Sequence, residues 1–305
     1  MKSSASVQKA VLQQRIAEGE EILARCQEIA SLAQGKLEDA IPRLVDFLGA
    51  GDPLVRREAS EALALLAKRT QRHSHLGLRA PTIGCEELLA LLQKNLQAKE
   101  AHRRAATADT LGLWGYEPAI PLLLEALQEQ DPSVRASAAT ALGQMRALEA
   151  TKPLLALLED PSPWVRLAAA EALGQIGAEK ATADLAKLLQ DAHPAVRLKA
   201  ALALGHSSTG KARRILENCA LGPDPALRWA AAKGLATVGD AGSLPILEDL
   251  VDEQEAFFAQ PTGQLAQRAI RAIRAKEEGF WGWLHRLLAS IAHWLRKRRG
   301  ISGDE

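Results

Sequence analysis

Histidine is the first residue type to test for chemistry in this chain, because imidazole can act as a general base or bind a metal ion near neutral pH. His73 and His75 flank a single serine, and two histidines alone make an incomplete metal site. His193 has no histidine or carboxylate partner at ligand spacing. We therefore expect no metal centre, and we assign His193 a structural role at the start of a helix.

Other catalytic motifs are also missing. The sequence contains no Gly-rich phosphate loop, no Gly-x-Ser-x-Gly and no His-Glu-x-x-His, so neither phosphoryl transfer nor hydrolysis is indicated. Cys26, Cys85 and Cys219 are scattered, odd in number and without a Cys-x-x-Cys pair, which argues against a disulfide framework or a zinc ribbon. We predict no catalytic residue, no cofactor and no metal.

Arginine is the charged residue whose position repeats. Five arginines stand at intervals of 31 residues, and a leucine follows each of them seven places later: Arg104, Arg135, Arg166, Arg197 and Arg228. A period of this length is typical of a solenoid, in which each unit contacts its neighbours. The arginine falls in the first turn of a helix, where the helix dipole disfavours a cation. It therefore needs a specific acceptor, and we predict the capping aspartate or a backbone carbonyl of a neighbouring repeat.

Two helices per repeat must position these arginines. In one repeat, residues 121–129 form a predicted helix A and residues 134–145 a predicted helix B. Five residues precede a proline at the start of a helix B: Asp52, Asp131, Ser162, His193 and Asp224. Asp and Ser are favoured N-caps, and proline at the first helical position sacrifices no helical hydrogen bond.

The strings DPSVRASAATALGQM and PWVRLAAAEALGQIG resemble short HEAT repeats of the phycobilisome-lyase-like class. The resemblance covers residues 37–240. It implies an all-α fold, a right-handed α-solenoid of HEAT-like helix pairs whose B helices line the concave face. Proteins of this repeat class serve as scaffolds, adaptors, chromophore lyases and a few enzymes, so the resemblance is specific for fold and weak for function.

Departures from the period predict the domain organisation. Residues 1–36 are expected to form N-terminal capping helices, residues 37–278 a solenoid of about seven units, and residues 279–305 an amphipathic basic helix and tail. An insertion near 69–85 separates the first two repeats, and its residues 70–81 suggest a long loop, which in a solenoid often marks a contact site. After Gly239 the pattern decays into a terminal repeat, with helices predicted at 243–255 and 265–276.

The composition of the chain limits the classes of partner that it is expected to bind. The net charge is +1, with 47% hydrophobic and 4% aromatic residues, so a general attraction to nucleic acid is disfavoured. The chain begins without an apolar secretory signal, and it has no uncharged apolar run of about 18 residues. We expect a cytoplasmic protein.

Large apolar residues occupy helix B positions that should face outward. The predicted partner-binding residues are Trp164, Leu167, Leu198, Leu202 and Trp229. Exposed apolar patches tend to be interaction sites, and tryptophan is frequent in binding hot spots. Two interpretations stay open: these side chains bind a protein partner on the concave face, or they fill the grooves between adjacent B helices.

Residues 280–299, FWGWLHRLLASIAHWLRKRR, form a predicted amphipathic helix. Its apolar face and its terminal basic run comprise Phe280, Trp281, Trp283, Leu284, Leu287, Leu288, Ile291, Trp294, Leu295, Arg296, Lys297, Arg298 and Arg299. Tryptophan beside a cationic run suits an anionic membrane surface. Two alternatives stay open, a cap on the last repeat and insertion into a groove of a partner.

These observations favour a non-catalytic scaffold or assembly factor for protein–protein interaction, peripheral on a membrane or membrane complex. The alternative is a phycobilin lyase-like protein that binds a bilin or a phycobiliprotein, since the reacting thiol would then belong to the substrate. The di-iron hydroxylases built from HEAT repeats use His-Glu pairs, and no histidine here precedes a glutamate, so that activity is disfavoured.

Overall fold

A computed structural model describes the chain apart from residues 1, 76–82, 178, 258–259, 278 and 280–305. It consists of α-helices and short 3-10 helices, with one small hairpin of two-residue strands among the described residues. The chain divides into two compact units, Met1–Ile176 and Gly177–Glu305. The predicted all-α solenoid is confirmed.

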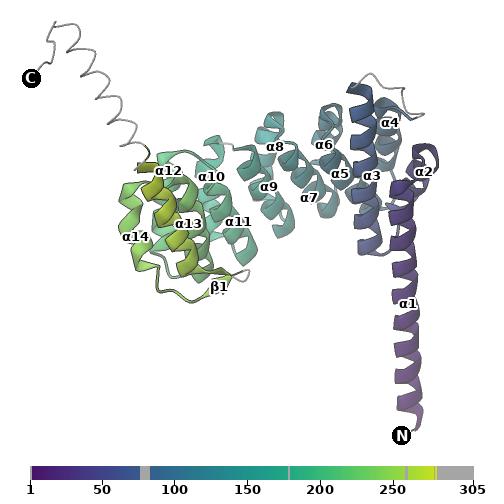
Figure 1. The fold of residues 1–305 in the computed structure, drawn as a ribbon, viewed down its shortest axis with the longest axis horizontal. Coiled ribbons are helices and arrows are strands. Elements are labelled where there is room, and N and C mark those ends of the chain that lie inside the picture. The colour runs from purple at the N-terminus through teal and green to yellow at the C-terminus, as the bar shows by residue number, and fades with distance from the viewer. Residues whose placement is uncertain (1, 76–82, 178, 258–259, 278, 280–305) are drawn as a thin grey trace, which may run out of the picture. The chain divides into compact units, whose positions relative to one another are not determined.

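The first unit consists of successive helix pairs (Figure 1). Its elements are α1 (Lys2–Gln34), α2 (Leu37–Phe47), α3 (Pro53–His75), α4 (Cys85–Leu96), α5 (Ala101–Trp114), η1 (Glu117–Ala119), α6 (Ile120–Ala126), α7 (Pro132–Gln144), η2 (Leu148–Ala150), α8 (Thr151–Ala156), η3 (Leu157–Glu159) and α9 (Pro163–Ile176). The B helices α3, α5, α7 and α9 pack against one another in chain order, and α1 covers α3.

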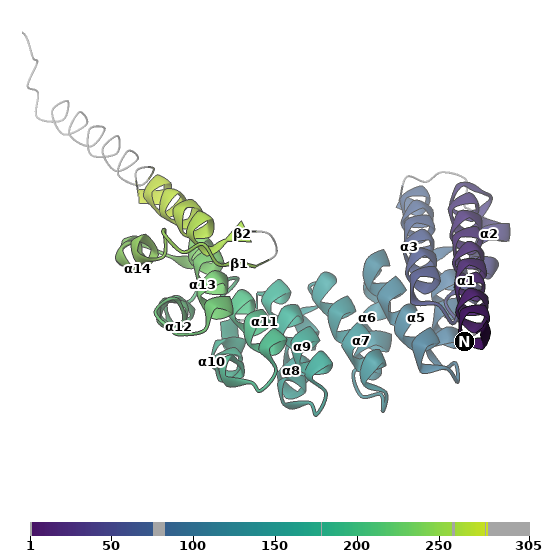
Figure 2. The same cartoon turned by 90° about the horizontal axis from the view of Figure 1, so that it is seen from below.

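The second unit repeats the same plan and ends in the hairpin and one more helix. Its elements are η4 (Glu179–Ala181), α10 (Thr182–Lys187), η5 (Leu188–Gln190), α11 (Pro194–Leu204), α12 (Gly210–Ala220), α13 (Pro225–Val238), η6 (Ala241–Ser243), α14 (Leu244–Asp249), β1 (Ala256–Phe257), β2 (Gln260–Pro261) and a helix over 262–277. The antiparallel strands β1 and β2 lie near α13 (Figure 2).

The Asp-Pro pairs start helix B as predicted. The side chain of Asp131 accepts a hydrogen bond from the backbone N–H of Ser133 at 2.8 Å, and Asp224 accepts from Ala226 at 3.0 Å. Where His193 occupies the same position, Asp191 accepts from the His193 N–H at 2.8 Å instead. Each carboxylate satisfies a backbone donor that the helix leaves unpaired.

Small residues let neighbouring B helices approach closely. A Cβ built on Gly112 would lie 2.6 Å from the Cα of Ala141, and one on Gly143 would lie 2.6 Å from the Cα of Ala172. In the second unit, a Cβ on Gly205 would lie 2.7 Å from the Cα of Gly234. No side chain fits at these positions, so the helix spacing depends on glycine.

Two predicted boundaries are corrected. The insertion does not begin as a loop, because α3 continues through residues 69–75, and residues 76–82 lie outside the described part. The helix expected over 243–255 ends at Asp249, since the chain then turns into the hairpin. None of the helices within the described ranges is both long and apolar enough to cross a membrane.

Candidate functional site

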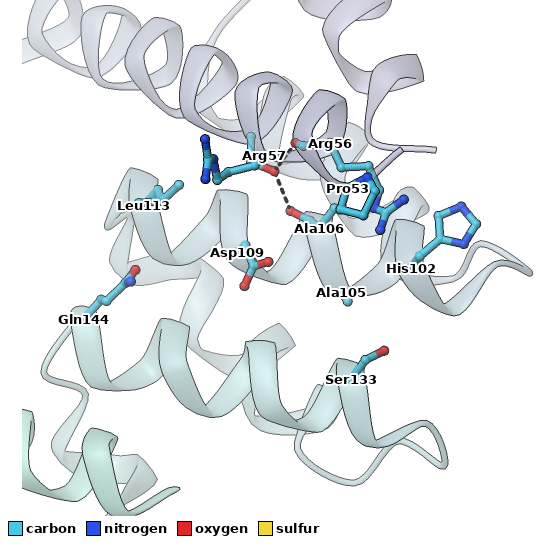
Figure 3. Close-up of a pocket in the computed structure, with 11 residues that line it drawn as sticks. Pro53, Arg56, Arg57, His102, Ala105, Ala106, Asp109, Leu113, Ser133 and Gln144 are labelled. Atoms are coloured by element: carbon cyan, nitrogen blue, oxygen red, sulfur yellow. Dashed lines mark hydrogen bonds between the residues drawn. The ribbon is translucent and has the colours of Figure 1, made fainter. Parts of the chain in front are cut away.

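A groove runs between three consecutive B helices of the first unit (Figure 3). Its volume is about 450 Å³. Eleven residues line it: Pro53, Arg56, Arg57 and Ser60 from α3, His102, Ala105, Ala106, Asp109 and Leu113 from α5, and Ser133 and Gln144 from α7. Three repeats therefore contribute to one site, which is how a solenoid builds a binding surface.

The floor of the groove is made of small residues. Ala105 and Ala106 are 8% and 5% exposed, so the backbone of α5 lies close beneath the surface. The Ser60 hydroxyl donates to the carbonyls of Arg56 at 3.0 Å and Ala106 at 3.2 Å, which joins α3 to α5 (dashed in Figure 3). The floor is thereby fixed, with its polar groups already satisfied.

Asp109 lies on the side of α5 that faces α7 (Figure 3). Burial raises the pKa of its carboxyl group, and a hydrogen bond from the Ser137 hydroxyl lowers the pKa by a smaller amount. Desolvation disfavours the charged form of a carboxyl group. Perturbed acids that line a cavity are candidates for binding sites.

The basic residues of the groove are engaged with other groups of the chain. Arg57 lies 3.3 Å from Glu58 and 3.8 Å from Glu61, and its side chain is 65% exposed. Arg56 donates to the carbonyls of Ala50 and Gly51 at 2.7 and 2.8 Å. These cations therefore shape the rim of the groove through contacts within α3 and the loop before it.

The repeated arginine binds backbone carbonyls, as predicted, but those of its own repeat. Arg135 Nη1 donates to the carbonyls of Glu129 and Gln130 at 2.7 and 2.8 Å, in the loop that leads into α7. The prediction of a neighbouring repeat's carbonyl is wrong, because the arginine side chain folds back over the N-terminus of its own helix, five and six residues earlier.

The link to the next repeat is a carboxylate. Ion pairs of this kind join residues 25 or 27 positions apart, and they include Arg104–Glu129, Arg135–Asp160, Arg197–Asp224 and Arg228–Glu253. Only Asp224 among these acids is also the predicted N-cap. These arginines therefore form a structural ladder in which each guanidinium binds an acid of the next repeat, although Arg104 Nε has no hydrogen-bond partner among the described residues.

The predicted partner-binding residues fall into both units. In the first, Trp164 is 63% exposed at the start of α9, and Leu167 is half-buried one turn later. In the second, Leu198 and Leu202 are half-buried on α11. Their role in binding stays a prediction.

Trp229 does not face outward, and that part of the prediction is wrong. Its side chain is 2% exposed, its indole N–H donates to the carbonyl of Gln260 at 3.0 Å, and Lys233 Nζ lies 5.2 Å from the ring centroid. The hairpin after the last regular repeat supplies the acceptor. Trp229 is therefore a packing residue of the second unit.

The remaining chemical candidates are not brought together. Burial, and to a smaller extent the Asp224 carboxylate, raise the pKa of the Cys219 thiol to about 11. Such a thiol is protonated and unreactive at neutral pH. Within the described ranges, no three His, Cys, Asp or Glu side chains are placed to hold a metal ion. The amphipathic segment 280–299 lies outside the described residues.

Sequence reasoning missed Asp109. It stands five places after Arg104, and the corresponding residues of other repeats include Glu61, Thr140, Glu171 and Lys233. Because this helix position is mostly polar, its one large apolar member, Leu202, drew the prediction toward the later repeats. A single carboxylate flanked by Ala105 and Leu113 was the available signal.

These repeats are similar to repeats of known proteins. A sequence family described as HEAT repeats matches residues 120–193 and 182–261, and no curated protein matches the chain by sequence. The structure of YibA from E. coli aligns at 17% identity with a TM-score of 0.51, covering 78% of this chain and 82% of that one. This likeness shows the fold alone.

Two further structures align less well. The complex of CpcE and CpcF of phycocyanin lyase from Nostoc sp. PCC7120 aligns at 21% identity with a TM-score of 0.44, covering 75% of this chain and 93% of that one. An engineered protein aligns at 25% identity with a TM-score of 0.45, covering 61% and 98%. Together with the helix pairs and the arginine ladder, the family match shows that residues 120–261 of this chain consist of HEAT repeats.

Proposed function

We propose that this chain is a non-catalytic scaffold or assembly factor that binds a segment of a partner protein in the groove between α3, α5 and α7. The observation that carries the proposal is the lining of the groove. An apolar floor of Ala105, Ala106 and Leu113 lies between polar groups from all three helices. This combination suits a peptide, whose side chains alternate with backbone donors and acceptors.

The dimensions of the groove support the same conclusion. Its volume of about 450 Å³ falls within the range of sites that bind small ligands or a few side chains. Ser133 and Gln144 lie at opposite ends of α7 and are both exposed, so an extended segment that follows the groove would meet hydrogen-bonding groups at each end.

The apolar residues of later repeats extend this proposal. Trp164 is large, exposed and close to Leu167 in sequence, and tryptophan is frequent in binding hot spots. We include Trp164, Leu167, Leu198 and Leu202 as further contacts for the partner. Trp164 and Leu167 would contact the partner from the first unit, and Leu198 and Leu202 from the second.

The C-terminal segment completes the proposal. Residues 280–299 carry three tryptophans and end in Arg296-Lys297-Arg298-Arg299. Indole rings suit the headgroup layer, and each basic residue near an anionic surface adds about 1 kcal/mol of attraction. The segment would hold the scaffold on an anionic membrane surface.

The groove is tested with peptides selected on the full-length chain. A phage-displayed random dodecapeptide library is panned against the wild-type chain, and selected peptides are synthesised and titrated. Ser133→Trp places a bulky ring at the exposed end of the groove, and Lys187→Trp, at an exposed position of the second unit, is the matched control. We expect the first to abolish binding and the second to leave it unchanged.

Two results would contradict the proposal. One is that the wild-type chain selects no peptide. The other is that the selected peptides bind Ser133→Trp as tightly as the wild type. Titration with a free bilin, followed by visible absorption, tests the lyase-like alternative with the same variants.

A further inference from the structure

Asp109 is an acidic residue whose carboxyl group has no basic partner among the described residues. Its only described side-chain partner is the Ser137 hydroxyl of α7, and no Lys, Arg or His among the described residues forms an ion pair with it. The groove in which it lies is open to solvent and large enough to admit a side chain. Asp109 is therefore accessible to a ligand and short of a cation.

The nearby basic groups are held in other contacts. Arg57 pairs with Glu58 and Glu61. Arg56 is bound to two carbonyls of the loop before α3, and the His102 ring lies 3.3 Å from the carbonyl of Gly49. From α7, the groove is lined by the neutral side chains of Ser133 and Gln144, and the neutral Ser137 hydroxyl contacts Asp109.

The equivalent residue of the preceding repeat has a different environment from that of Asp109. Glu61 occupies the same helix position in α3, but its side chain is 57% exposed and lies near the Arg57 guanidinium. Asp109 is half-buried and lacks such a neighbour. A partly desolvated carboxylate gains most from a cationic donor, because charge-assisted hydrogen bonds strengthen where water is excluded.

We infer that the groove selects a protein segment with one lysine or arginine side chain, which enters between α5 and α7 and binds the Asp109 carboxylate. The inference rests on the proposed function, since it names the chemistry of the bound segment. The residues that flank the basic one meet the apolar floor, so we expect them to be small or apolar. A segment with an acidic residue at the same place would be rejected by like-charge repulsion.

The test uses the peptide selection described above, run in parallel on the wild-type chain, Asp109→Asn and Glu171→Gln. Glu171 is the matched control, because it occupies the same helix position in α9 and does not line the described groove. We expect peptides from the wild type and from Glu171→Gln to share a lysine or arginine at one position. Peptides selected on Asp109→Asn should lack that preference.

A double-mutant cycle then isolates the pair. One selected peptide is synthesised with its basic residue and with norleucine in its place. Norleucine should weaken binding to the wild-type chain by about ten-fold or more, and by much less on Asp109→Asn. Asp109→Glu keeps the charge, so it should preserve the preference for the basic peptide.

The outcomes separate this inference from the proposed function. If norleucine weakens binding equally on the wild type and on Asp109→Asn, the pairing with Asp109 is wrong, although the groove can still bind peptides. If selected peptides contain no preferred basic residue but lose binding on Ser133→Trp, the inference fails and the scaffold proposal stands. If Ser133→Trp has no effect, both fail.

Discussion

Arg135 binds the carboxylate of Asp160 with two parallel hydrogen bonds, Nε to Oδ2 at 2.9 Å and Nη2 to Oδ1 at 3.0 Å. Its remaining nitrogen, Nη1, donates to the carbonyls of Glu129 and Gln130. Asp160 Oδ1 also accepts from the Ser162 N–H at 2.8 Å. One guanidinium thus joins the loop before α7 to the loop before α9, and Arg104–Glu129, Arg197–Asp224 and Arg228–Glu253 are similar links within single units.

Asp160→Asn should destabilise the first unit by about 3 kcal/mol, because it leaves the guanidinium of Arg135 without its charged partner in a largely buried place. The two side chains are 6% and 15% exposed. The measurement is the free energy of unfolding in urea. Asp46→Asn is the control, since Asp46 is 82% exposed beside Arg103 and should lose less than about 1 kcal/mol. Equal losses would show that burial does not govern the ladder.

Gly143→Ala should destabilise the first unit by about 1–3 kcal/mol through overpacking. The new Cβ would lie 2.6 Å from the Cα of Ala172 and 2.7 Å from Gln175 Oε1, so the α7–α9 spacing must increase. Gly19→Ala is the matched control, because Gly19 lies within α1 with nothing within 4 Å of a Cβ. It should stabilise its helix by about 1 kcal/mol. Thermal melts of both variants measure the two effects: the melting temperature should fall for Gly143→Ala and rise for Gly19→Ala.

Local chemistry made much of the fold predictable. Asp131-Pro132 marks a helix start by itself, since the cap and the fixed proline angle act within one turn. The need of Arg135 for an acceptor also followed from its place in the first turn. The identity of that acceptor did not, because Asp160 is 25 residues away and its distance depends on how two repeats stack.

The surroundings of Trp229 and Asp109 could not be predicted from the periodic pattern. The acceptor of Trp229 belongs to a hairpin in which the repeat has already decayed, so the spacing could not place it. Asp109 is half-buried because Gly112 and Ala141 let α5 approach α7, which places Ser137 against the carboxyl group. That environment arises from packing between helices, and one residue's identity does not reveal it.

Asp109→Asn should make the chain more stable at neutral pH. Burial raises the pKa of Asp109, so the folded state binds this proton more tightly than the unfolded state, and stability falls as pH rises through the folded-state pKa. Asparagine has no charged form and can still accept from Ser137. The gain should therefore shrink as pH falls below the pKa of the unfolded chain.

Urea unfolding of both proteins at pH 7, and at the lowest pH at which the wild type stays folded, measures this difference. A variant that is less stable at pH 7 would mean that the charged carboxylate stabilises the fold. If Asp109→Asn is more stable than the wild type and has lost the preference for basic peptides, then Asp109 serves binding and lowers stability, as functional residues commonly do.

Trp229→Ala should cost about 3–5 kcal/mol of unfolding free energy, because it empties a fully buried aromatic site. Trp229→Phe keeps most of the packing and removes the donor to the Gln260 carbonyl, so a loss of about 1 kcal/mol is expected. Trp164→Ala is the control for an exposed ring and should change stability by less than about 0.5 kcal/mol. If Trp164 and Trp229 gave equal losses, the assignment of one to the surface and one to the core would be wrong.

A chain that ends at Glu278 should fail to bind anionic vesicles that the full-length chain binds. The segment removed contains Trp281, Trp283, Trp294 and the basic run that ends at Arg299, which together supply indole insertion and electrostatic attraction. Co-sedimentation with vesicles of phosphatidylcholine and phosphatidylserine measures the bound fraction, and added salt should release it, because surface attraction is screened.

A second full-length variant with Arg296, Lys297, Arg298 and Arg299 changed to glutamine should lose the salt-sensitive part of the binding and keep the part that comes from apolar insertion. Equal pelleting of the full and shortened chains would remove the membrane proposal. Loss of solubility on shortening, without vesicle binding by the full chain, would assign the segment to covering the last repeat.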